Sequence, residues 1–305
     1  MENVHIVDEA KVSNEPYNIN PTKYALIGAA IGIVVAMIII FLQNMLDDSI
    51  RNENDIEHQL GIKTLAKFRK QPKNTKLGWN PKYDYVEGVK ALRTNLQFVK
   101  RDKNIKTIAI TSSMPGEGKS WITTNLALAY AKADYKVCIV DADMRKGTQH
   151  IKLGIEQTPG LSDLIKGSDD INNIRLIFDK YIQPTRIENI SLLPCGKNTF
   201  DSSELLISNK LNKLVDILKA NFDIIIFDST PGTLVTDATI LCRLVETNII
   251  VVEHEKTKMK ELKRIKDLIE SVGGDLAGVV INKISDGKKK KEYYYYGGNK
   301  TNPRH

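Results

Sequence analysis

A glycine-rich stretch between a β-branched run and a helical pattern carries the clearest chemistry in the sequence. Residues 107–120 read TIAITSSMPGEGKS, and Gly118-Lys119-Ser120 opens the helical pattern. In such a loop, backbone N–H groups surround phosphates, the lysine reaches the β and γ oxygens, and the serine hydroxyl binds Mg²⁺. The formal pattern has glycine where Ser113 stands, and serine can still make the turn. A plain strand-to-helix turn is the alternative interpretation. The residues expected to contact phosphates are Ser113, Pro115, Gly116, Glu117, Gly118, Lys119, Ser120 and Trp121.

Three aspartates follow apolar runs further along the chain. Asp141 and Asp143 lie in the segment CIVDADMR, and Asp228 ends the run FDIIIFD. Spacing of two residues on an extended segment points both carboxylates the same way, and Asp228 is placed like a Walker B aspartate that holds Mg²⁺. We expect Ser120, Asp141 and Asp228 to hold the metal. Lys119 and the three aspartates form the expected catalytic group, with Asp141 as the base that accepts a hydroxyl proton. Arg145 is expected to orient phosphate or a neighbouring subunit. Capping of the next turn is the alternative role for Asp143.

The elements that must position these residues alternate between strands and helices. Apolar runs recur at 137–140, 190–193, 222–227, 248–252 and 277–281, and helical stretches such as 204–219 and 258–272 separate most of them. This alternation predicts an α/β fold, with a parallel β-sheet flanked by helices as in P-loop NTPases. Ligands in that architecture bind at the carboxyl ends of the strands. The phosphate loop and the three aspartates are all predicted there.

Composition and charge narrow the class of protein. The chain has 305 residues and a formal net charge of +7. Its lysines concentrate towards the C-terminus and do not follow a nucleic-acid-binding motif, so we expect no nucleic-acid partner and instead an anionic lipid or a charged protein.

Cys138, Cys195 and Cys242 are widely spaced in apolar or mixed stretches. That spacing predicts reduced, structural cysteines, with neither a disulfide nor a metal site.

The first half of the chain holds a candidate membrane anchor. Residues 1–24 are polar and carry no cleavable leader pattern, whereas residues 25–42 carry no charge and the apolar tract extends to Leu46. That length spans a bilayer, so we predict one transmembrane helix over 25–46. A buried core helix is the alternative. Residues 47–82 are expected to be a juxtamembrane segment followed by a linker, and a nucleotide site places the C-terminal side in the cytoplasm.

A helix before the loop and a tail after the sheet complete the pattern. Apolar residues at helical spacing predict a helix over 84–100, with Glu87, Lys90 and Arg93 on one face.

The tail has a lysine run at 288–291 and then Tyr293, Tyr294, Tyr295 and Tyr296. Four successive tyrosines face every direction and cannot all enter a core. We interpret them as accessible phosphoacceptors; a basic tail that touches a membrane or nucleic acid is the alternative.

Together these motifs resemble the bacterial tyrosine kinases of capsule and exopolysaccharide assembly. The resemblance is carried by SSMPGEGKS, IVDADMR, IIIFDSTP and the terminal tyrosine run. It implies an ATP-dependent protein tyrosine kinase, using ATP/ADP and Mg²⁺, that autophosphorylates its tail in trans. The expected domains are a polar extracytoplasmic segment (1–24), a transmembrane helix (25–46), a juxtamembrane activator segment with a linker (47–82), a P-loop kinase domain (83–286) and a Lys/Tyr-rich tail (287–305).

The same resemblance implies several partners. Family members form ring-like homo-oligomers through a Glu-x-x-Arg-x-x-Arg motif, which Glu87, Lys90 and Arg93 match at two of three positions. The segment before the kinase is similar to the end of a Wzz/CapA-type membrane activator, without that activator's first transmembrane helix and external domain. We therefore expect either a partner elsewhere or a fusion with its junction between Phe68 and Tyr83. A cognate tyrosine phosphatase and polysaccharide-synthesis proteins as substrates are also implied, at the bacterial cell membrane.

Two other functions fit the motifs less well. A partition ATPase of the MinD/ParA type shares the fold and both Walker motifs, but such proteins carry a second lysine where Met114 stands. A nucleotide-binding scaffold of a polysaccharide export complex, without catalysis, is compatible with every residue. The family favours Asp-Thr-Pro-Pro after the Walker B strand, and here the sequence Asp228-Ser229-Thr230-Pro231 departs from it, which mildly favours the scaffold.

Overall fold

The computed structural model describes residues 20–70, 83–99, 105–232 and 236–285, and the chain divides into two compact units, residues 1–48 and 49–305. The polar segment 1–19, the linker 71–82 and the tail 286–305 lie outside the described residues. The predictions made for the linker and for the four tail tyrosines therefore stay predictions.

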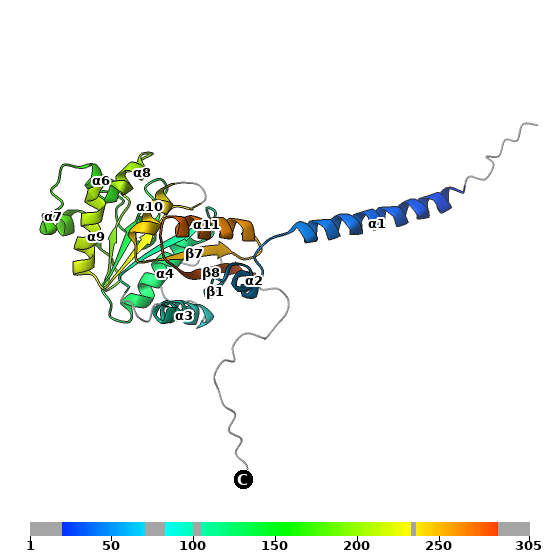
Figure 1. The fold of residues 1–305 in the computed structure, drawn as a ribbon, viewed down its shortest axis with the longest axis horizontal. Coiled ribbons are helices and arrows are strands. Elements are labelled where there is room, and N and C mark those ends of the chain that lie inside the picture. Colours follow the sequence, from blue (N-terminus) through cyan, green and yellow to red (C-terminus); the bar gives the residue numbers. More distant parts are fainter. Residues whose placement is uncertain (1–19, 71–82, 100–104, 233–235, 286–305) are drawn as a thin grey trace, which may run out of the picture. The chain divides into compact units, whose positions relative to one another are not determined.

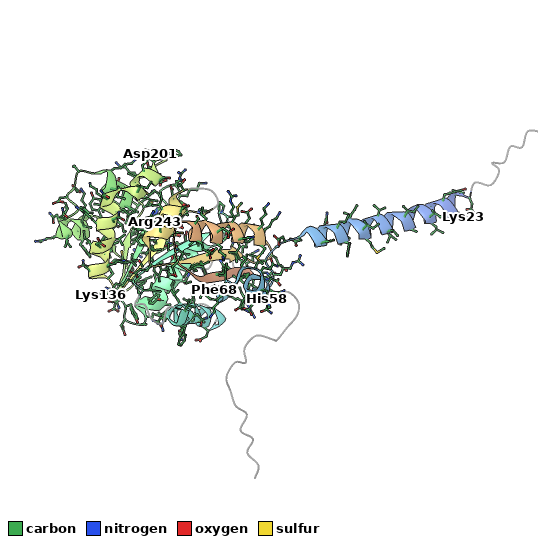
Figure 2. The ribbon with its side chains drawn as sticks, viewed as in Figure 1. Lys23, His58, Phe68, Lys136, Asp201 and Arg243 are labelled. Carbon is green, nitrogen blue, oxygen red and sulfur yellow. The ribbon has the colours of Figure 1, made fainter. Side chains whose placement is uncertain are left out.

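The first unit contains one long apolar helix, α1 (Pro21–Leu46). Within it, Pro21–Gln43 has a mean hydropathy of 3.0 and contains no buried residue. Its side chains project outward along its length, with Lys23 near its beginning (Figure 2). An uncovered apolar helix of this length is suited to the interior of a bilayer. The predicted span therefore coincides with an actual helix that is long and apolar enough to cross a membrane.

The second unit is built on one eight-stranded sheet. The strands, in spatial order, are β1 (Thr64–Arg69), β8 (Leu276–Ile284), β7 (Thr247–Glu253), β2 (Thr107–Ser112), β6 (Ile224–Asp228), β3 (Val137–Asp141), β5 (Ile190–Leu193) and β4 (Gln183–Pro184). All neighbours are parallel except β4 and β5. The three strands expected to carry the site, β2, β6 and β3, are adjacent. Their carboxyl ends therefore meet at one place.

Helices cover both faces of this sheet, as continuous apolar strands require (Figure 1). Alternate residues of each strand face opposite ways, so Ile108 and Ile110 pack with α3 (Tyr83–Val99) and α4 (Lys119–Ala131), while Ala109 packs with the helices of the other face. The remaining helices are α2 (Glu53–Leu60), α5 (Gln149–Leu153), α6 (Leu161–Lys166), α7 (Ile174–Lys180), α8 (Ser202–Ile207), α9 (Asn209–Asn221), α10 (Thr236–Leu244) and α11 (Met259–Ser271).

The sheet has two strands that the sequence did not predict. β4 is a two-residue antiparallel addition, and β1 is the edge strand from the juxtamembrane segment, with Leu65 and Phe68 buried. Phe68 lies on β1 within this unit (Figure 2). β4 has only two residues, and the β1 sequence TLAKFR is not the continuous apolar run that marks the central strands. The predicted α/β fold with a parallel sheet is confirmed.

The helical stretch predicted over 204–219 is divided into two helices. Ser208 adopts an extended backbone (φ −64°, ψ 144°) and separates α8 from α9. Ser208 is the residue before α9 begins, and its side chain makes no capping hydrogen bond to that helix. The apolar spacing continued across the break and hid it.

Candidate active site

The phosphate loop connects β2 to α4 and is held closely by the last strand. Gly118 has φ +104°, and a Cβ atom there would lie 2.1 Å from Nδ2 of Asn282. The same Nδ2 donates a hydrogen bond of 2.8 Å to the carbonyl oxygen of Glu117. Both the backbone angle and this contact require glycine. The predicted strand, loop and helix are therefore present, and Asn282 on β8 is a support that the sequence analysis missed.

The side chain of Glu117 shapes the loop from inside. Its carboxylate accepts hydrogen bonds from the backbone N–H of Met114, at 2.8 Å, and from the Thr257 hydroxyl. Burial raises the pKa of Glu117, against the lowering effect of these hydrogen bonds. Glu117 was predicted as a phosphate contact. In the structure its carboxylate holds the loop, so its contribution to anion binding is left to its backbone N–H.

Lys119 is surrounded by the predicted carboxylates. Its Nζ lies 3.2 Å from Oδ2 of Asp143 and 3.5 Å from Oδ1 of Asp228. Burial opposes the charge of Lys119, but the carboxylates of Asp228 and Asp143 outweigh it and raise the lysine pKa. Asp143 also accepts the backbone N–H of Lys146 at 3.0 Å. Asp143 therefore caps the turn, which was the alternative role considered for it, and also pairs with Lys119; its catalytic role stays a prediction.

Asp141 has the most perturbed electrostatics of the group. Burial, followed by the charge of Asp228, raises its pKa to about 8. Its Oδ2 accepts the backbone N–H of Gln149 at 3.0 Å, whereas its buried Oδ1 has no hydrogen-bond partner among the described residues. The charges of all three carboxylates act on Lys119, and Asp141 keeps one buried oxygen without a partner. This donor set fits a divalent cation such as Mg²⁺, which binds carboxylate and phosphate oxygens.

Gln149, the first residue of α5, links these parts. Its Nε2 donates to Oδ2 of Asp228 at 2.8 Å and to the carbonyl oxygen of Ser120 at 2.9 Å, and its Oε1 accepts the Thr124 hydroxyl at 2.8 Å. The side chain is fully buried. Gln149 therefore positions the Walker B aspartate against the start of α4. It follows Asp141 by eight residues, a spacing that carries no known signature, so the sequence analysis missed it.

The other predicted contacts lie around the loop. Pro115 and Gly116 are exposed, Ser113 is buried, and Ser120 is half-buried with its Oγ 3.3 Å from Nζ of Lys119. The ring of Trp121 packs edge-on against Phe68 of β1, with centroids 5.7 Å apart. The side chain of Trp121 therefore belongs to the packing of the juxtamembrane strand.

Arg145 and the α3 motif have partners within the chain. Nε of Arg145 lies 3.4 Å from the buried carboxylate of Asp237. On α3, Lys90 pairs with Glu87 at 3.2 Å, and Arg93 donates to the carbonyl oxygen of Ala129 at 2.9 Å. Glu87 and Lys90 are both partly exposed. Their predicted role in oligomerisation, and that of Arg145 towards phosphate or a neighbouring subunit, stays a prediction.

The unusual turn after Asp228 is firmly held. The backbone N–H of Ser229 donates to the Ile110 carbonyl oxygen at 3.1 Å, and the Thr111 hydroxyl donates to the Thr230 carbonyl oxygen at 3.1 Å. Ser229 and Thr230 are buried. The departure from the expected turn sequence therefore leaves Asp228 in place at the end of β6.

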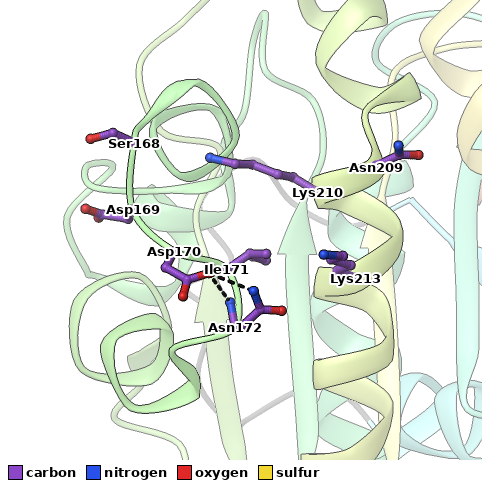
Figure 3. Close-up of a pocket in the computed structure, with 8 residues that line it drawn as sticks. All are labelled: Ser168, Asp169, Asp170, Ile171, Asn172, Asn209, Lys210 and Lys213. Atoms are coloured by element: carbon purple, nitrogen blue, oxygen red, sulfur yellow. Dashed lines mark hydrogen bonds between the residues drawn. The ribbon is translucent and has the colours of Figure 1, made fainter.

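A separate surface hollow of about 400 Å³ lies beside the start of α9 (Figure 3). Its lining consists of Ser168, Asp169, Asp170, Ile171, Asn172, Asn209, Lys210 and Lys213. Asp169 accepts from Lys180 at 2.7 Å, and Lys210 donates to the carbonyl oxygen of Gly167 at 2.6 Å. The hollow contains none of the predicted site residues, and two of its charged groups already have partners, so we assign it no role.

Comparison with known proteins gives the family. The AAA domain family matches residues 105–277, more than half of the chain. CapB of Staphylococcus aureus, named as an inferred tyrosine-protein kinase, is 36% identical over 204 residues, which are 67% of this chain and 86% of CapB. The chain belongs to the bacterial tyrosine kinases. The resemblance found in its motifs is thereby confirmed.

Two further relatives show how the kinase compares along its length. The tyrosine-protein kinase ptk of Acinetobacter johnsonii is 28% identical over 296 residues, 92% of this chain but 39% of ptk. This kinase therefore spans about two fifths of that longer relative. The crystal structure of the chimerical protein CapA2B2 matches with a TM-score of 0.69 and 35% identity, covering 77% of this chain and all of the chimera.

Proposed function

We propose that this kinase transfers the γ-phosphoryl group of ATP to Tyr293–Tyr296 of a neighbouring copy, and thereby regulates capsular or exopolysaccharide polymerisation and export. The observation that carries the proposal is the placement of Lys119 among Asp141, Asp143 and Asp228, at the carboxyl ends of β2, β3 and β6. Phosphoryl transfer needs positioning, charge neutralisation and a proton acceptor. Membership of the tyrosine kinase family supports tyrosine as the acceptor.

The chain supplies each part of the transfer. Lys119 and the loop N–H groups bind the phosphates, and Ser120, Asp141 and Asp228 are the residues that would hold Mg²⁺, which neutralises phosphate charge when bound. The tyrosine oxygen forms a bond to the γ-phosphorus, the bond from that phosphorus to the bridging oxygen breaks, and ADP leaves. Oδ1 of Asp141 takes the hydroxyl proton. Its raised pKa suits a proton acceptor near neutral pH.

The juxtamembrane segment 47–68 acts as a built-in activator. Ile50 exchanges backbone hydrogen bonds with the loop after β7: its N–H donates to Thr257, and its carbonyl oxygen accepts from Glu255, both at 2.9 Å. Thr257 in turn holds Glu117 of the phosphate loop. Docking of this segment therefore fixes the loop in its binding conformation. The similarity to a chimera of CapA and CapB components agrees with an activator joined to a kinase.

The assembly follows from the same layout. α1 anchors the kinase in the bacterial cell membrane with its catalytic unit in the cytoplasm, and the Glu87 face of α3 joins copies into a ring so that each tail reaches the next site. Phosphorylation adds roughly −1.5 to −2 charge per tyrosine. Those charges repel each other and the acidic site, which frees the tail and loosens the ring. A cognate tyrosine phosphatase reverses the change, and polysaccharide-synthesis proteins are further substrates.

A mixing experiment tests transfer in trans. One chain carries Lys119→Met with its four tail tyrosines intact, and the other has an intact site with those tyrosines changed to phenylalanine. We expect labelled phosphate from ATP, with Mg²⁺, on the tail of the Lys119→Met chain only when both are present. Lys136→Met, at the opposite end of the sheet on an exposed side chain, is the matched control and keeps activity.

The products separate the alternatives. Label that accumulates only as free phosphate would identify an ATPase, and nucleotide binding without turnover would identify a scaffold. Label on the tail of the wild-type chain assayed alone, together with an unlabelled Lys119→Met chain in the mixture, would overturn transfer between copies.

A further inference from the structure

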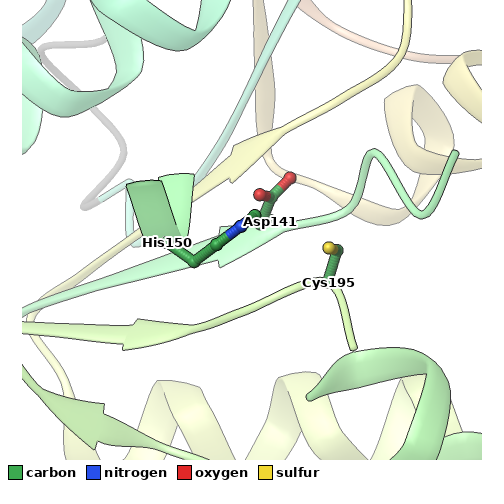
Figure 4. Close-up of side chains that lie close together, drawn as sticks. All are labelled: Asp141, His150 and Cys195. Carbon is green, nitrogen blue, oxygen red and sulfur yellow. The ribbon is translucent and has the colours of Figure 1, made fainter. Parts of the chain in front are cut away.

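Three metal-binding side chains from different parts of the chain meet beside the phosphate loop. Asp141 ends β3, His150 lies on α5, and Cys195 follows β5. One ligand atom of each lies within 4.8 Å of the other two (Figure 4). The wide spacing of the cysteines had predicted that none of them belongs to a metal site. That spacing could not show that Cys195 lies near Asp141 and His150 in the fold.

The space between them is kept open by a glycine. A Cβ atom on Gly147 would lie 2.5 Å from Sγ of Cys195 and 2.7 Å from Oδ2 of Asp141, so any larger residue would push both atoms away. Oδ1 of Asp141 and Nδ1 of His150 are buried and have no hydrogen-bond partner among the described residues. Buried polar atoms without partners are rare in folded proteins. Two of them in one cluster point to a ligand between them.

The donor types select the ligand. A carboxylate, an imidazole and a thiolate form the mixed oxygen, nitrogen and sulfur set that Zn²⁺ accepts, whereas Mg²⁺ prefers oxygen alone. Zn²⁺ binds a neutral imidazole nitrogen and a deprotonated thiolate. Burial and the neighbouring Asp141 raise the pKa of Cys195 to about 12, so metal binding must displace the thiol proton to solvent.

We propose that Asp141, His150 and Cys195 form a Zn²⁺ site with its fourth position open, and that a bound Zn²⁺ withdraws Asp141 from phosphoryl transfer. Zn²⁺ binding does not depend on the proposed kinase function, whereas inhibition by Zn²⁺ rests on that function. The site makes the kinase sensitive to free zinc, because one carboxylate serves two metals of different preference. Mg²⁺ at high concentration therefore competes with Zn²⁺ for the carboxylate of Asp141.

Cobalt substitution tests the binding. Co²⁺ replaces Zn²⁺ in such sites, and a bond from thiolate sulfur to Co²⁺ gives a near-ultraviolet charge-transfer band. We expect that band when the full chain in detergent is titrated with Co²⁺, and its loss on adding Zn²⁺. Cys195→Ala should abolish the band, and His150→Ala should weaken metal affinity by more than about tenfold. Cys242→Ala, which removes a buried thiol from the core beneath α11, is the matched control and keeps the band.

Activity gives an independent measurement. Tail phosphorylation should fall with added Zn²⁺ and recover with excess Mg²⁺, and the zinc concentration for half inhibition should rise at least about tenfold in His150→Ala, relative to that variant's own zinc-free rate. A band that is absent, or that persists in Cys195→Ala, would overturn the site. A normal band without inhibition would retain the site and overturn its regulatory role. Absence of any kinase activity would affect the proposed function alone.

Discussion

Asp141 and Asp228 are register partners on the adjacent parallel strands β3 and β6, and both are fully buried. Strand pairing therefore fixes two carboxylates side by side at one end of the sheet, with Lys119 between them and the phosphate loop. Like charges held this close disfavour simultaneous ionisation. Ionisation of both carboxylates would therefore be accompanied by repulsion, which a cation bound beside them would relieve.

The first prediction concerns stability and pH. The pKa of Asp141 is about 8 in the folded protein, above its ordinary value of 3.8, so ionisation of this group destabilises the fold. That cost is absent below about pH 4 and grows as the pH rises towards 8. Asp141→Asn should therefore raise the free energy of unfolding of the nucleotide-free protein at pH 8, by on the order of 1–3 kcal/mol, and change it little at pH 4.

Chemical denaturation of the full chain in detergent at the two pH values measures this difference. Asp216→Asn, an exposed carboxylate on α9, is the control and should show no pH-dependent gain. An Asp141→Asn variant that is equally destabilised at both pH values would contradict the electrostatic explanation.

A second prediction concerns Gln149 as a positioning residue. Gln149→Leu keeps the volume but removes the hydrogen bonds to Asp228 and to Ser120. We expect kcat for tail phosphorylation to fall by roughly 10- to 100-fold, with a smaller change in KM for ATP, because the aspartate loses its orientation while the loop persists. Gln97→Leu on the exposed side of α3 serves as the control. An equal loss in both variants would show that the effect is not specific to the site.

A third prediction concerns Thr257, which contacts both the juxtamembrane segment and Glu117 of the phosphate loop. Thr257→Val removes the hydroxyl that donates to Glu117 and leaves that buried carboxylate with one bond fewer. Affinity for ADP should fall by about 1 kcal/mol, or roughly fivefold, measured by calorimetry. Thr239→Val on α10, a half-buried threonine away from the loop, should leave the affinity unchanged. Unchanged ADP affinity in Thr257→Val would show that the segment 47–68 does not influence nucleotide binding through Thr257.

A fourth prediction concerns the α3 face. Arginine forms bidentate contacts with carboxylates and lysine does not, so Lys90→Arg should strengthen any contact that Lys90 makes with a neighbouring copy. We expect a larger average mass in light scattering at the same protein concentration. Lys263→Arg on the exposed side of α11 is the matched control. An unchanged mass would place Lys90 outside the interface.

The sequence predicted most of the fold because the central strands are continuous apolar runs separated by helical patterns. The strands that carry the site and the helix after the loop all lie where the pattern placed them. It failed at β1, where six residues with partial alternation add a strand, and at Ser208, which breaks a helix whose apolar spacing continues on both sides. In both places the pattern of apolar residues does not show where the element begins or ends.

The sequence by itself determined the chemistry: a phosphate loop ending in Lys119-Ser120, and aspartates that end buried strands. Local spacing sufficed, because each of these residues occupies a fixed place next to its own strand or helix. Only the tertiary structure decided how they are supported. Gln149, Thr257 and Asn282 reach the site from separate elements, and Asp141, His150 and Cys195 meet there although Cys195 is 45 or more residues distant from the other two. Such contacts follow from strand order and register, which bring together positions that no pattern along the chain connects.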